Sequence, residues 1–329
     1  MLKILYAGSP AIAAKPLIEI EHSKKHQIVG VLANPPAAQK RGKELISTPV
    51  AQALHTLNEE RAQNGEPAIA LFEPHKLSAV QSAIEALKPD ILVCFAYGKI
   101  FKPEFMAIFP LGGINLHPSL LPKYRGCAPV PAAILNQDKE TGFTVQRLAQ
   151  QMDSGNILLQ TRFALDGTEY AEDILEKASN EGGKLFLEVL EKIENNTISA
   201  NETAQNEADA TYFGMLKKED SAINWNDSAE SICAKIRAFE PWPGASTAAN
   251  GNALIIHRAT VYKGDSYNQA EAEGKAAGEV LFSDKKEGIL IKTGSGILAV
   301  QNLQWQTKKA MNWKDFMNGA RNFVGSVCN

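Results

Sequence analysis

The chain has 329 residues, of which 44% are hydrophobic and 22% are charged, and 34 Lys and Arg against 37 Asp and Glu give a formal net charge of −3. At about 100 to 200 residues per domain, this length predicts two folded units, each large enough to bury its own core. The composition excludes a disordered chain, a collagen-like fibre and a disulfide scaffold, and no apolar run reaches the ~18 residues of a membrane span.

The first part of the chain alternates short apolar runs with helical patterns. Residues 1–6 enter a strand pattern directly and lack the features of a signal peptide, so we expect a cytoplasmic protein without a membrane partner. A helix is predicted over 49–64, with Thr48 as N-cap and Pro49 at its first position. Strand–helix alternation predicts a parallel sheet, which binds ligands beyond the carboxyl ends of its strands. The predicted strands are 3–7, 28–32, 68–72, 90–95 and 113–116.

The second part of the chain changes character after a long amphipathic helix predicted over 170–193. Residues 194–210 are polar and poor in large apolar side chains, which is typical of a linker. A helix over 228–239 and the turn-rich 241–244 precede several short strands, a pattern that favours a small β-barrel. The predicted barrel strands are 253–261, 278–282, 288–292 and 296–303.

Two common kinds of site are disfavoured. Gly8 follows the first strand but is succeeded by Ser9-Pro10, so no G-x-G-x-x-G fingerprint of a nicotinamide-binding dehydrogenase occurs there. The cysteines lie far apart with no C-x-x-C pair, which predicts no structural metal site: Cys94, Cys127, Cys233 and Cys328.

The segment that follows the strand at 113–116 carries the chemistry. Asn115 and His117 are two positions apart, so a strand presents both side chains on one face, and Pro118 places them at its carboxyl end. Such a pair can equally be a hydrogen-bonded pair in the core.

An acidic residue further along the chain can complete the site. Asp153 lies in the turn 151–155 after a strand predicted over 143–148, and its carboxylate could hold the His117 ring in its charged form. The alternative is that Asp153 only caps its own turn, and the spacing alone favours neither. An amide, an imidazole and a carboxylate together would support acyl transfer through a stabilised oxyanion.

The run from 114 to 158 closely resembles the folate-dependent formyltransferase family, with its Asn-x-His pair, its Ser-Leu-Leu-Pro-x-x-Arg-Gly run at 119–126 and its Asp-Ser-Gly at 153–155. Further motifs resemble the branch of the family that acts on initiator tRNA, and they extend over essentially the whole chain. They are 8–10, 40–43, 96–98, 128–129, 237–239 and 241–244.

The resemblance implies a Rossmann-like formyltransferase domain over 1–193, a linker over 194–210 and an OB-like β-barrel over 211–329 that binds tRNA. It implies transfer of the formyl group of 10-formyltetrahydrofolate, a consumed cosubstrate, to the α-amino group of methionyl initiator tRNA. Asn115, His117 and Asp153 match the catalytic trio, with no metal and no obligate protein partner.

The resemblance also assigns residues to the two substrates. Arg125 is expected to order its loop rather than act as an acid or base. For tRNA it implies Lys40, Arg41 and Lys43, although on the residues alone an ordinary solvated charged loop is favoured. For the folate it implies Phe95, Ala96, Tyr97, Gly98, Ser119, Leu120, Leu121, Pro122, Leu148 and Gln151.

Two other functions compete with this prediction. A formyltransferase acting on a nucleotide sugar or another small amine would share the trio but would not need the basic insertion or the tRNA-type carboxyl-terminal domain. A non-enzymatic tRNA-binding protein could keep the barrel but would have no reason to assemble the trio.

Overall fold

A computed structural model describes residues 1–38, 44–200, 202–320 and 322–329. The chain divides into two compact units. The first unit comprises Met1–Pro129, Thr141–Phe163 and Leu175–Tyr212, and the second comprises Val130–Glu140, Ala164–Ile174 and Phe213–Asn329. The domain bounds 1–193, 194–210 and 211–329 stay a prediction, and the polar stretch 194–210 groups with the first unit. No helix in the described ranges is both long enough and apolar enough to span a bilayer.

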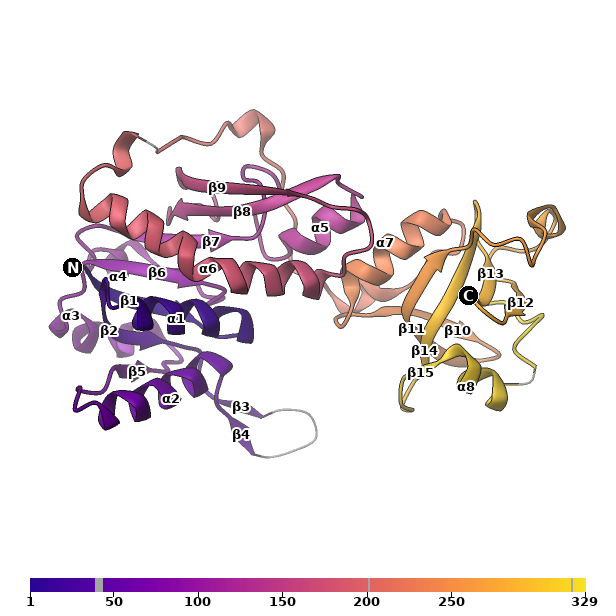
Figure 1. The fold of residues 1–329 in the computed structure, drawn as a ribbon, viewed down its shortest axis with the longest axis horizontal. Helices are drawn as coiled ribbons and strands as arrows, with labels where there is room; N and C mark the ends of the chain where they lie inside the picture. The colour runs from indigo at the N-terminus through magenta and orange to yellow at the C-terminus, as the bar shows by residue number, and fades with distance from the viewer. Residues whose placement is uncertain (39–43, 201, 321) are drawn as a thin grey trace. The chain divides into compact units, whose positions relative to one another are not determined.

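The first unit is built on a seven-stranded sheet in the order β5-β2-β1-β6-β7-β8-β9 (Figure 1). The first five of these pair in parallel, and β8 runs antiparallel to β7. The predicted parallel sheet is therefore confirmed, and each of its five predicted strands coincides with an observed one. Their bounds are β1 Lys3–Gly8, β2 Gln27–Leu32, β5 Ala70–Phe72, β6 Ile91–Phe95, β7 Gly113–His117, β8 Glu140–Arg147 and β9 Ile157–Ala164.

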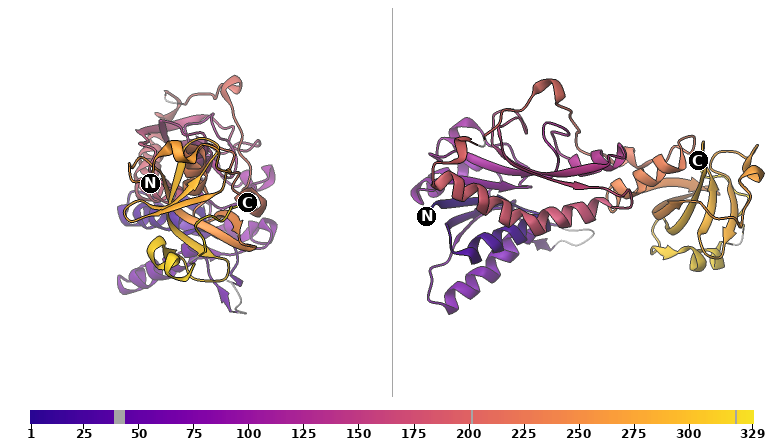
Figure 2. Two further views of the ribbon diagram at one scale, coloured as in Figure 1. Left: turned by 90° about the vertical axis from the view of Figure 1, so that its right-hand side faces the viewer. Right: turned by 45° about the horizontal axis from the view of Figure 1, so that its top comes forward.

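Helices cover both faces of this sheet, and Figure 2 shows α6 lying along one of them. On that face Gly182 of α6 contacts Leu116 of β7, and Tyr6 donates to the Ala13 carbonyl of α1 (2.6 Å). On the other face Phe105 of α4 packs with Cys94 of β6 in one apolar cluster. The helices of this unit are α1 Ala11–Ser23, α2 Pro49–Gln63, α3 Gln81–Ala86, α4 Pro103–Met106 and α6 Ala171–Glu194 from residue 175 onward, whereas α5 Pro129–Leu135 groups with the second unit from residue 130.

The position of β7 between these helices determines which sheet face each of its side chains occupies. Because alternate residues of a strand point to opposite faces, Leu116 under α6 places Asn115 and His117 on the face that carries α4. The predicted helix that precedes β5 is also present as α2, and the Thr48 hydroxyl accepts from the Ala51 amide (3.3 Å) as its N-cap.

The second unit contains an antiparallel sheet in the order β10-β11-β14-β13-β12, with β15 paired to β14. The carboxyl-terminal residues join its two edges, because Ala248 exchanges hydrogen bonds with Asn329 (2.9 Å each) and Cys328 donates to Gly278 (2.8 Å). A Cβ at Gly278, which has φ +87°, would overlap the Cys328 carbonyl, so this closure requires glycine. The strands are β10 Ala245–Ala249, β11 Asn252–Val261, β12 Val280–Asp284, β13 Gly288–Lys292, β14 Ile297–Trp305 and β15 Met311–Asn312.

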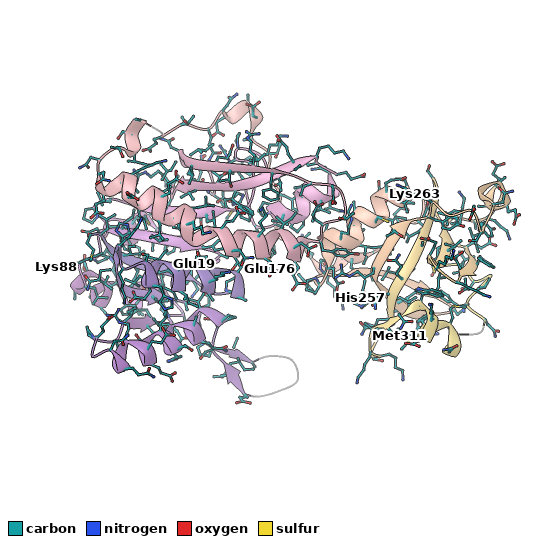
Figure 3. All side chains as sticks on the ribbon, viewed as in Figure 1. Glu19, Lys88, Glu176, His257, Lys263 and Met311 are labelled. Atoms are coloured by element: carbon teal, nitrogen blue, oxygen red, sulfur yellow. The ribbon has the colours of Figure 1, made fainter. Side chains whose placement is uncertain are left out.

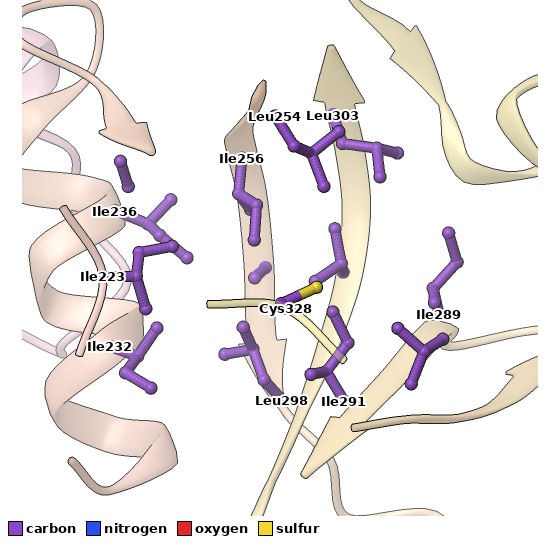
Figure 4. Close-up of a cluster of buried hydrophobic side chains, with 14 of the residues drawn as sticks. Ile223, Ile232, Ile236, Leu254, Ile256, Ile289, Ile291, Leu298, Leu303 and Cys328 are labelled. Carbon is purple, nitrogen blue, oxygen red and sulfur yellow. The ribbon is translucent and has the colours of Figure 1, made fainter. Parts of the chain in front are cut away.

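The core of this unit lies between the sheet and α7 (Ala229–Phe239). Ile232 and Ile236 of α7 face the sheet residues Ile256 and Leu298 (Figure 4). The predicted helix at 228–239 and the predicted strands are thus confirmed as one antiparallel strand domain. Two elements of this unit were not predicted, the strand β10 and the helix α8 (Trp313–Gly319). The strand β10 is a short run rich in Ala and Ser, which are not typical strand residues.

The half-buried ring of His257, labelled in Figure 3, lies where the β11 register shifts between Ile256 and Arg258. Its Nδ1 contacts Glu240 Oε2 and its Nε2 contacts Gln304 Oε1, each at 2.9 Å. The hydrogen bond to Glu240 raises the pKa of His257 above its ordinary value, and the one to Gln304 adds to this, while burial and Arg258 oppose it. Two acceptors on one ring favour the imidazolium.

The raised pKa of His257 predicts a pH-dependent contribution to stability. The contribution is fully present below the unfolded-state pKa of about 6.5 and is lost as the pH rises through the higher folded-state pKa. We expect His257→Gln to cost roughly 0.5–1 kcal/mol more at about pH 5.5 than at about pH 9, measured by urea unfolding. His55→Gln, on the exposed side of α2, is the control. An equal cost for His257→Gln at both pH values would contradict this role.

Candidate active site

The predicted trio meets beside the carboxyl end of β7. His117 is buried, with 4% of its surface exposed, and its Nδ1 lies 3.6 Å from Oδ1 of Asp153. Asn115 is half-buried two residues before His117 on the same strand face. The Asp153 carboxylate, which lies 36 residues beyond His117 in the sequence, is therefore brought to the strand that carries the amide and the imidazole.

The loop between β8 and β9 carries Asp153 back to β7. Its close return is possible because position 155 is glycine, since a Cβ there would overlap the Arg147 carbonyl. Asp153 adopts φ +54°, which is uncommon for a residue other than glycine. Its carboxylate accepts from the Gly126 amide at Oδ2 (2.9 Å) and from Gln146 Nε2 at Oδ1 (2.8 Å). Two N–H donors thus fix the carboxylate, so Asp153 does more than cap its own turn.

Hydrogen bonding also fixes the tautomer of His117. Its Nε2 lies 2.9 Å from the Tyr124 carbonyl, which can only accept, so Nε2 carries a proton. Nδ1, on the side of Asp153, carries the second proton when the ring is charged. At 3.6 Å, Nδ1 and Oδ1 form an ion pair in that state rather than a short hydrogen bond.

The Asn115 side chain is the free donor of the trio. Within residues 1–38, 44–200, 202–320 and 322–329, its amide makes no hydrogen bond to another protein group. The β7 register places Asn115 beside Cys94 on one side and Gln146 on the other. A half-buried amide that no protein group engages can donate to a substrate oxygen.

The Ser-Leu-Leu-Pro-x-x-Arg-Gly run forms the wall behind this trio. The buried Ser119 donates its hydroxyl to Lys123 O (2.7 Å), and Thr144 Oγ1 donates to Ser119 O (2.7 Å). Leu121 is buried, while Leu120 and Pro122 are half-buried. The run thereby presents the Tyr124 carbonyl and the Gly126 amide to the trio, and its contacts to a folate stay a prediction.

Arg125 organises this run from inside the protein. Its side chain is fully buried and pairs bidentately with Glu207, through Nη1 to Oε2 (2.9 Å) and Nη2 to Oε1 (2.7 Å). Nη1 also donates to Tyr212 Oη (2.9 Å). All these contacts are structural, in keeping with the prediction that Arg125 orders its loop.

The two loops predicted to bind the pterin share one apolar cluster. Tyr97, from the loop after β6, and Cys94 belong to it, and Leu148, from the loop after β8, packs against it. Leu148 also lies beside Gly113, on the same β7 face as Asn115. The buried Tyr97 hydroxyl has no partner in the described part of the chain. Burial, and then Cys94, raise the pKa of this phenol.

The thiol of Cys94 lies near both the loop of Tyr97 and the Asp153 carboxylate. Burial raises its pKa to about 12, the backbone of Tyr97 lowers it through a hydrogen bond, and the Asp153 carboxylate raises it. Cys94 is therefore a buried, unreactive neighbour of both Tyr97 and Asp153.

The other predicted folate residues differ in what they can offer. Ala96 (φ +52°) and Gly98 (φ +81°) shape the loop around Tyr97. Phe95 is buried one position out of phase with Cys94, so its side chain lies on the opposite sheet face and only its main chain can reach the site. Gln151 is exposed.

The basic residues assigned to tRNA, Lys40, Arg41 and Lys43, lie outside the described residues. The strands on either side of them, β3 (Ala37–Ala38) and β4 (Leu45–Ile46), pair antiparallel as a separate two-stranded sheet. The insertion after β2 is therefore a hairpin whose described flanks are fixed to each other.

Sequence reasoning missed the groups that hold the trio in place. They are the amide of Gln146, the main-chain groups of Tyr124 and Gly126, and the side chain of Gln205, which donates to the Asp153 carbonyl (2.8 Å). Main-chain groups leave no signal in a sequence. For Gln146 the signal was its strand position opposite Asn115, which becomes visible only once the antiparallel register is known.

In the part of the chain that the structure describes, no group of three or more His, Cys, Asp or Glu side chains is placed to hold a metal ion. Cys94, Cys233 and Cys328 are buried free thiols, and Cys127 is exposed.

Comparison with known proteins assigns both parts of the chain to the formyl transferase family. A family model described as formyl transferase matches residues 2–190, and one described as formyl transferase, C-terminal domain, matches residues 215–321. The chain is 46% identical to methionyl-tRNA formyltransferase of Treponema denticola over 98% of either chain. It is 42% identical to that of Treponema pallidum over 97% of either chain.

Among solved structures, HypX from Aquifex aeolicus in complex with tetrahydrofolic acid resembles the chain in fold. The TM-score is 0.65 at 15% identity, and the match covers 98% of this chain and 48% of HypX.

Proposed function

The chain belongs to the methionyl-tRNA formyltransferases of the formyl transferase family, and from this premise we propose that Asn115, His117 and Asp153 carry its reaction. The protein transfers the formyl group of 10-formyltetrahydrofolate to the α-amino group of methionyl initiator tRNA, which yields the N-formylmethionyl-tRNA used to initiate translation. The observation that supports the assignment of residues is the meeting of His117 and Asp153 (3.6 Å) beside the free Asn115 amide.

Asn115 and His117 are proposed to stabilise the negative charge that develops on the formyl oxygen. The Asn115 amide is available to donate without giving up a protein partner. The Nε2–H of His117 is already directed at the Tyr124 carbonyl, so it acts by being shared with, or turned toward, the substrate oxygen. A preorganised donor, such as the free Asn115 amide, typically makes the largest single contribution to acyl transfer.

Asp153 is proposed to complete the charge balance. When the C–N bond to the methionyl amine forms and the bond to N10 of the folate breaks, the amine loses a proton and N10 gains one. The Asp153 carboxylate supports the imidazolium of His117 and accepts or relays the amine proton. The Gly126 and Gln146 donors keep it oriented as an anion for this role.

The pterin ring is proposed to bind beside the loop of Tyr97. The apolar cluster that contains the buried Tyr97 supports this loop from beneath, and the half-buried Leu148, which packs against the cluster, lies on the β7 face of Asn115. The bound folate supplies the formyl group. Tyr97 and Leu148 are proposed to orient it over Asn115, together with main-chain atoms of Ala96, Gly98 and Phe95.

The tRNA is proposed to contact Lys40, Arg41 and Lys43, which lie between β3 and β4 in the sequence, as well as the antiparallel strand domain over 211–329. The protein is proposed to act in the cytoplasm, without an obligate protein partner. Cations on a loop gain affinity by releasing the counterions that surround phosphates, so their contribution falls as the salt concentration rises.

Replacing Arg41 with alanine is expected to weaken use of tRNA and to make its salt dependence shallower. Each lost phosphate contact reduces the slope of log(kcat/KM) against log[salt] by about 0.7 to 0.9. The slope is measured with charged initiator tRNA at saturating folate. Lys184→Ala, on the exposed face of α6, is the charge-matched control. Equal slopes for Arg41→Ala and the wild type would leave Arg41 as a solvated surface charge.

The reaction is tested directly with purified protein, 10-formyltetrahydrofolate labelled in the formyl group, and charged initiator tRNA. Label is expected on the α-amino group of the esterified methionine. The full-length similarity to methionyl-tRNA formyltransferases favours this acceptor over the nucleotide-sugar or small-amine alternative and over a non-enzymatic tRNA-binding protein. An amino sugar nucleotide offered in place of the tRNA should remain unlabelled, and label on it alone would refute the assignment.

A further inference from the structure

One glutamine outside the signature motifs joins the loop of Asp153 to the interior of the first unit. Gln205 Oε1 accepts from Arg125 Nε (3.0 Å), and its Nε2 donates to the carbonyls of Asp153 (2.8 Å) and Gly155 (2.7 Å). Nε2 also lies 3.3 Å from Gln146 Oε1. A single side-chain amide thereby contacts the signature run and the loop of Asp153, and reaches the neighbouring strand β8.

The orientation of this amide is set by its partners on both sides. Arg125 can only donate and the two carbonyls can only accept, so Oε1 must face Arg125 and Nε2 must face the loop. Arg125 itself cannot move freely, because it is fully buried and bonded to Glu207 and Tyr212. Gln205 is therefore held in a fixed position from behind.

The main chain around Gln205 is fixed as well. Thr203 exchanges backbone hydrogen bonds with Ile157 at the start of β9 (2.8 and 2.9 Å), and Arg125 N donates to Thr211 O (2.8 Å). The segment 203–212 is thus anchored at both of its ends. Its residues 203–210 belong to the predicted linker. Most of its residues are exposed to solvent, but the half-buried Gln205 and the exposed Glu207 both bond to the buried Arg125.

We propose that Gln205 is a positioning residue for Asp153, an inference that rests on the proposed function. Asp153 adopts φ +54°, and the Gln205 amide holds its carbonyl in that conformation. The two N–H bonds of Gln205 go to the Asp153 and Gly155 carbonyls, and Gln146 Oε1 at 3.3 Å lies on the same side, which suits the orientation in which Gln146 Nε2 faces Asp153 Oδ1 (2.8 Å). Gln205 therefore fixes the main chain of the residue whose carboxylate lies 3.6 Å from His117.

The test uses two substitutions at one position. Gln205→Glu keeps an acceptor for Arg125 but removes the donor to the Asp153 and Gly155 carbonyls, whereas Gln205→Ala removes both. Because a small displacement of a reacting group can cost about 100-fold, each variant is expected to lower kcat by roughly 10- to 100-fold while KM for the folate changes less than about threefold. Thermal melting should show Gln205→Glu folded.

The neighbouring residue provides a matched control. Asn206 bonds only within its own segment, to Ala208 N (3.2 Å) and Asp209 Oδ2 (2.8 Å), in the part of the chain that the structure describes. Asn206→Ala disturbs the segment without touching the loop of Asp153. It is expected to keep wild-type kcat.

A double-mutant cycle separates positioning from general support of the fold. If Gln205 acts through Asp153, adding Gln205→Ala to Asp153→Asn should lower the residual single-turnover rate by less than about twofold. An equal loss in both backgrounds, or wild-type kcat for Gln205→Glu, would overturn the inference. Failure of the wild-type protein to formylate tRNA would instead overturn the proposed function, so the two failures are distinct.

Discussion

Replacing Asp153 with asparagine is expected to lower kcat for formyl transfer by about 100- to 10,000-fold, the usual contribution of a positioned acid or base. The substitution removes the negative charge beside His117 Nδ1 and the acceptor for the amine proton. It also replaces one carboxylate oxygen by an NH₂ group, which must then face an N–H donor, either the Gly126 amide or Gln146 Nε2. Single-turnover assays with labelled folate measure the loss.

The same variant should still bind charged initiator tRNA, because Asp153 is not among the groups proposed to contact it. Binding titrations and a thermal melt therefore accompany the assay. Lost formylation with retained tRNA binding supports an enzyme rather than a passive tRNA-binding protein. A kcat within about threefold of wild type would exclude Asp153 from the chemistry.

Replacing Asn115 with alanine should cost about 100- to 1000-fold in kcat, the typical effect of losing one oxyanion donor. Stability should hardly change, because the Asn115 amide has no protein partner in the described ranges and its removal leaves no group unpaired. KM for the folate should stay close to wild type, since the interaction forms only as charge develops.

Asn115→Asp sharpens this test because it keeps the shape of the side chain while replacing the donor with a negative charge. It is expected to be at least as inactive as Asn115→Ala. Near-wild-type turnover in either variant would remove Asn115 from the mechanism. Asp153→Asn disturbs a hydrogen-bonded network whereas Asn115→Ala does not, so comparison of their melting temperatures distinguishes loss of chemistry from loss of structure.

Local sequence was sufficient where the structure depends on short-range geometry. The two-residue spacing of Asn115 and His117 before Pro118 placed both on one strand face, and Thr48-Pro49 marked the start of α2. The resemblance to the formyltransferase family added Asp153, which spacing alone could not separate from a turn cap.

The polar stretch 194–210 shows where composition stops being informative. A shortage of large apolar residues is typical of a linker, yet Gln205 and Glu207 accept hydrogen bonds from the fully buried Arg125. A polar side chain bonded to a buried guanidinium and one bonded to water have the same composition, so only the folded structure tells them apart.

The amino-acid sequence by itself determined the parallel sheet, the antiparallel strand domain and the shared face of Asn115 and His117, because strand alternation and helix capping act over a few residues. The tertiary structure alone decided that Asp153 returns to His117 and that Gln205 reaches Arg125 across 80 residues of chain. These contacts depend on the antiparallel register of β8, the close approach at Gly155 and the burial of one cation. None of these is a property of neighbouring residues.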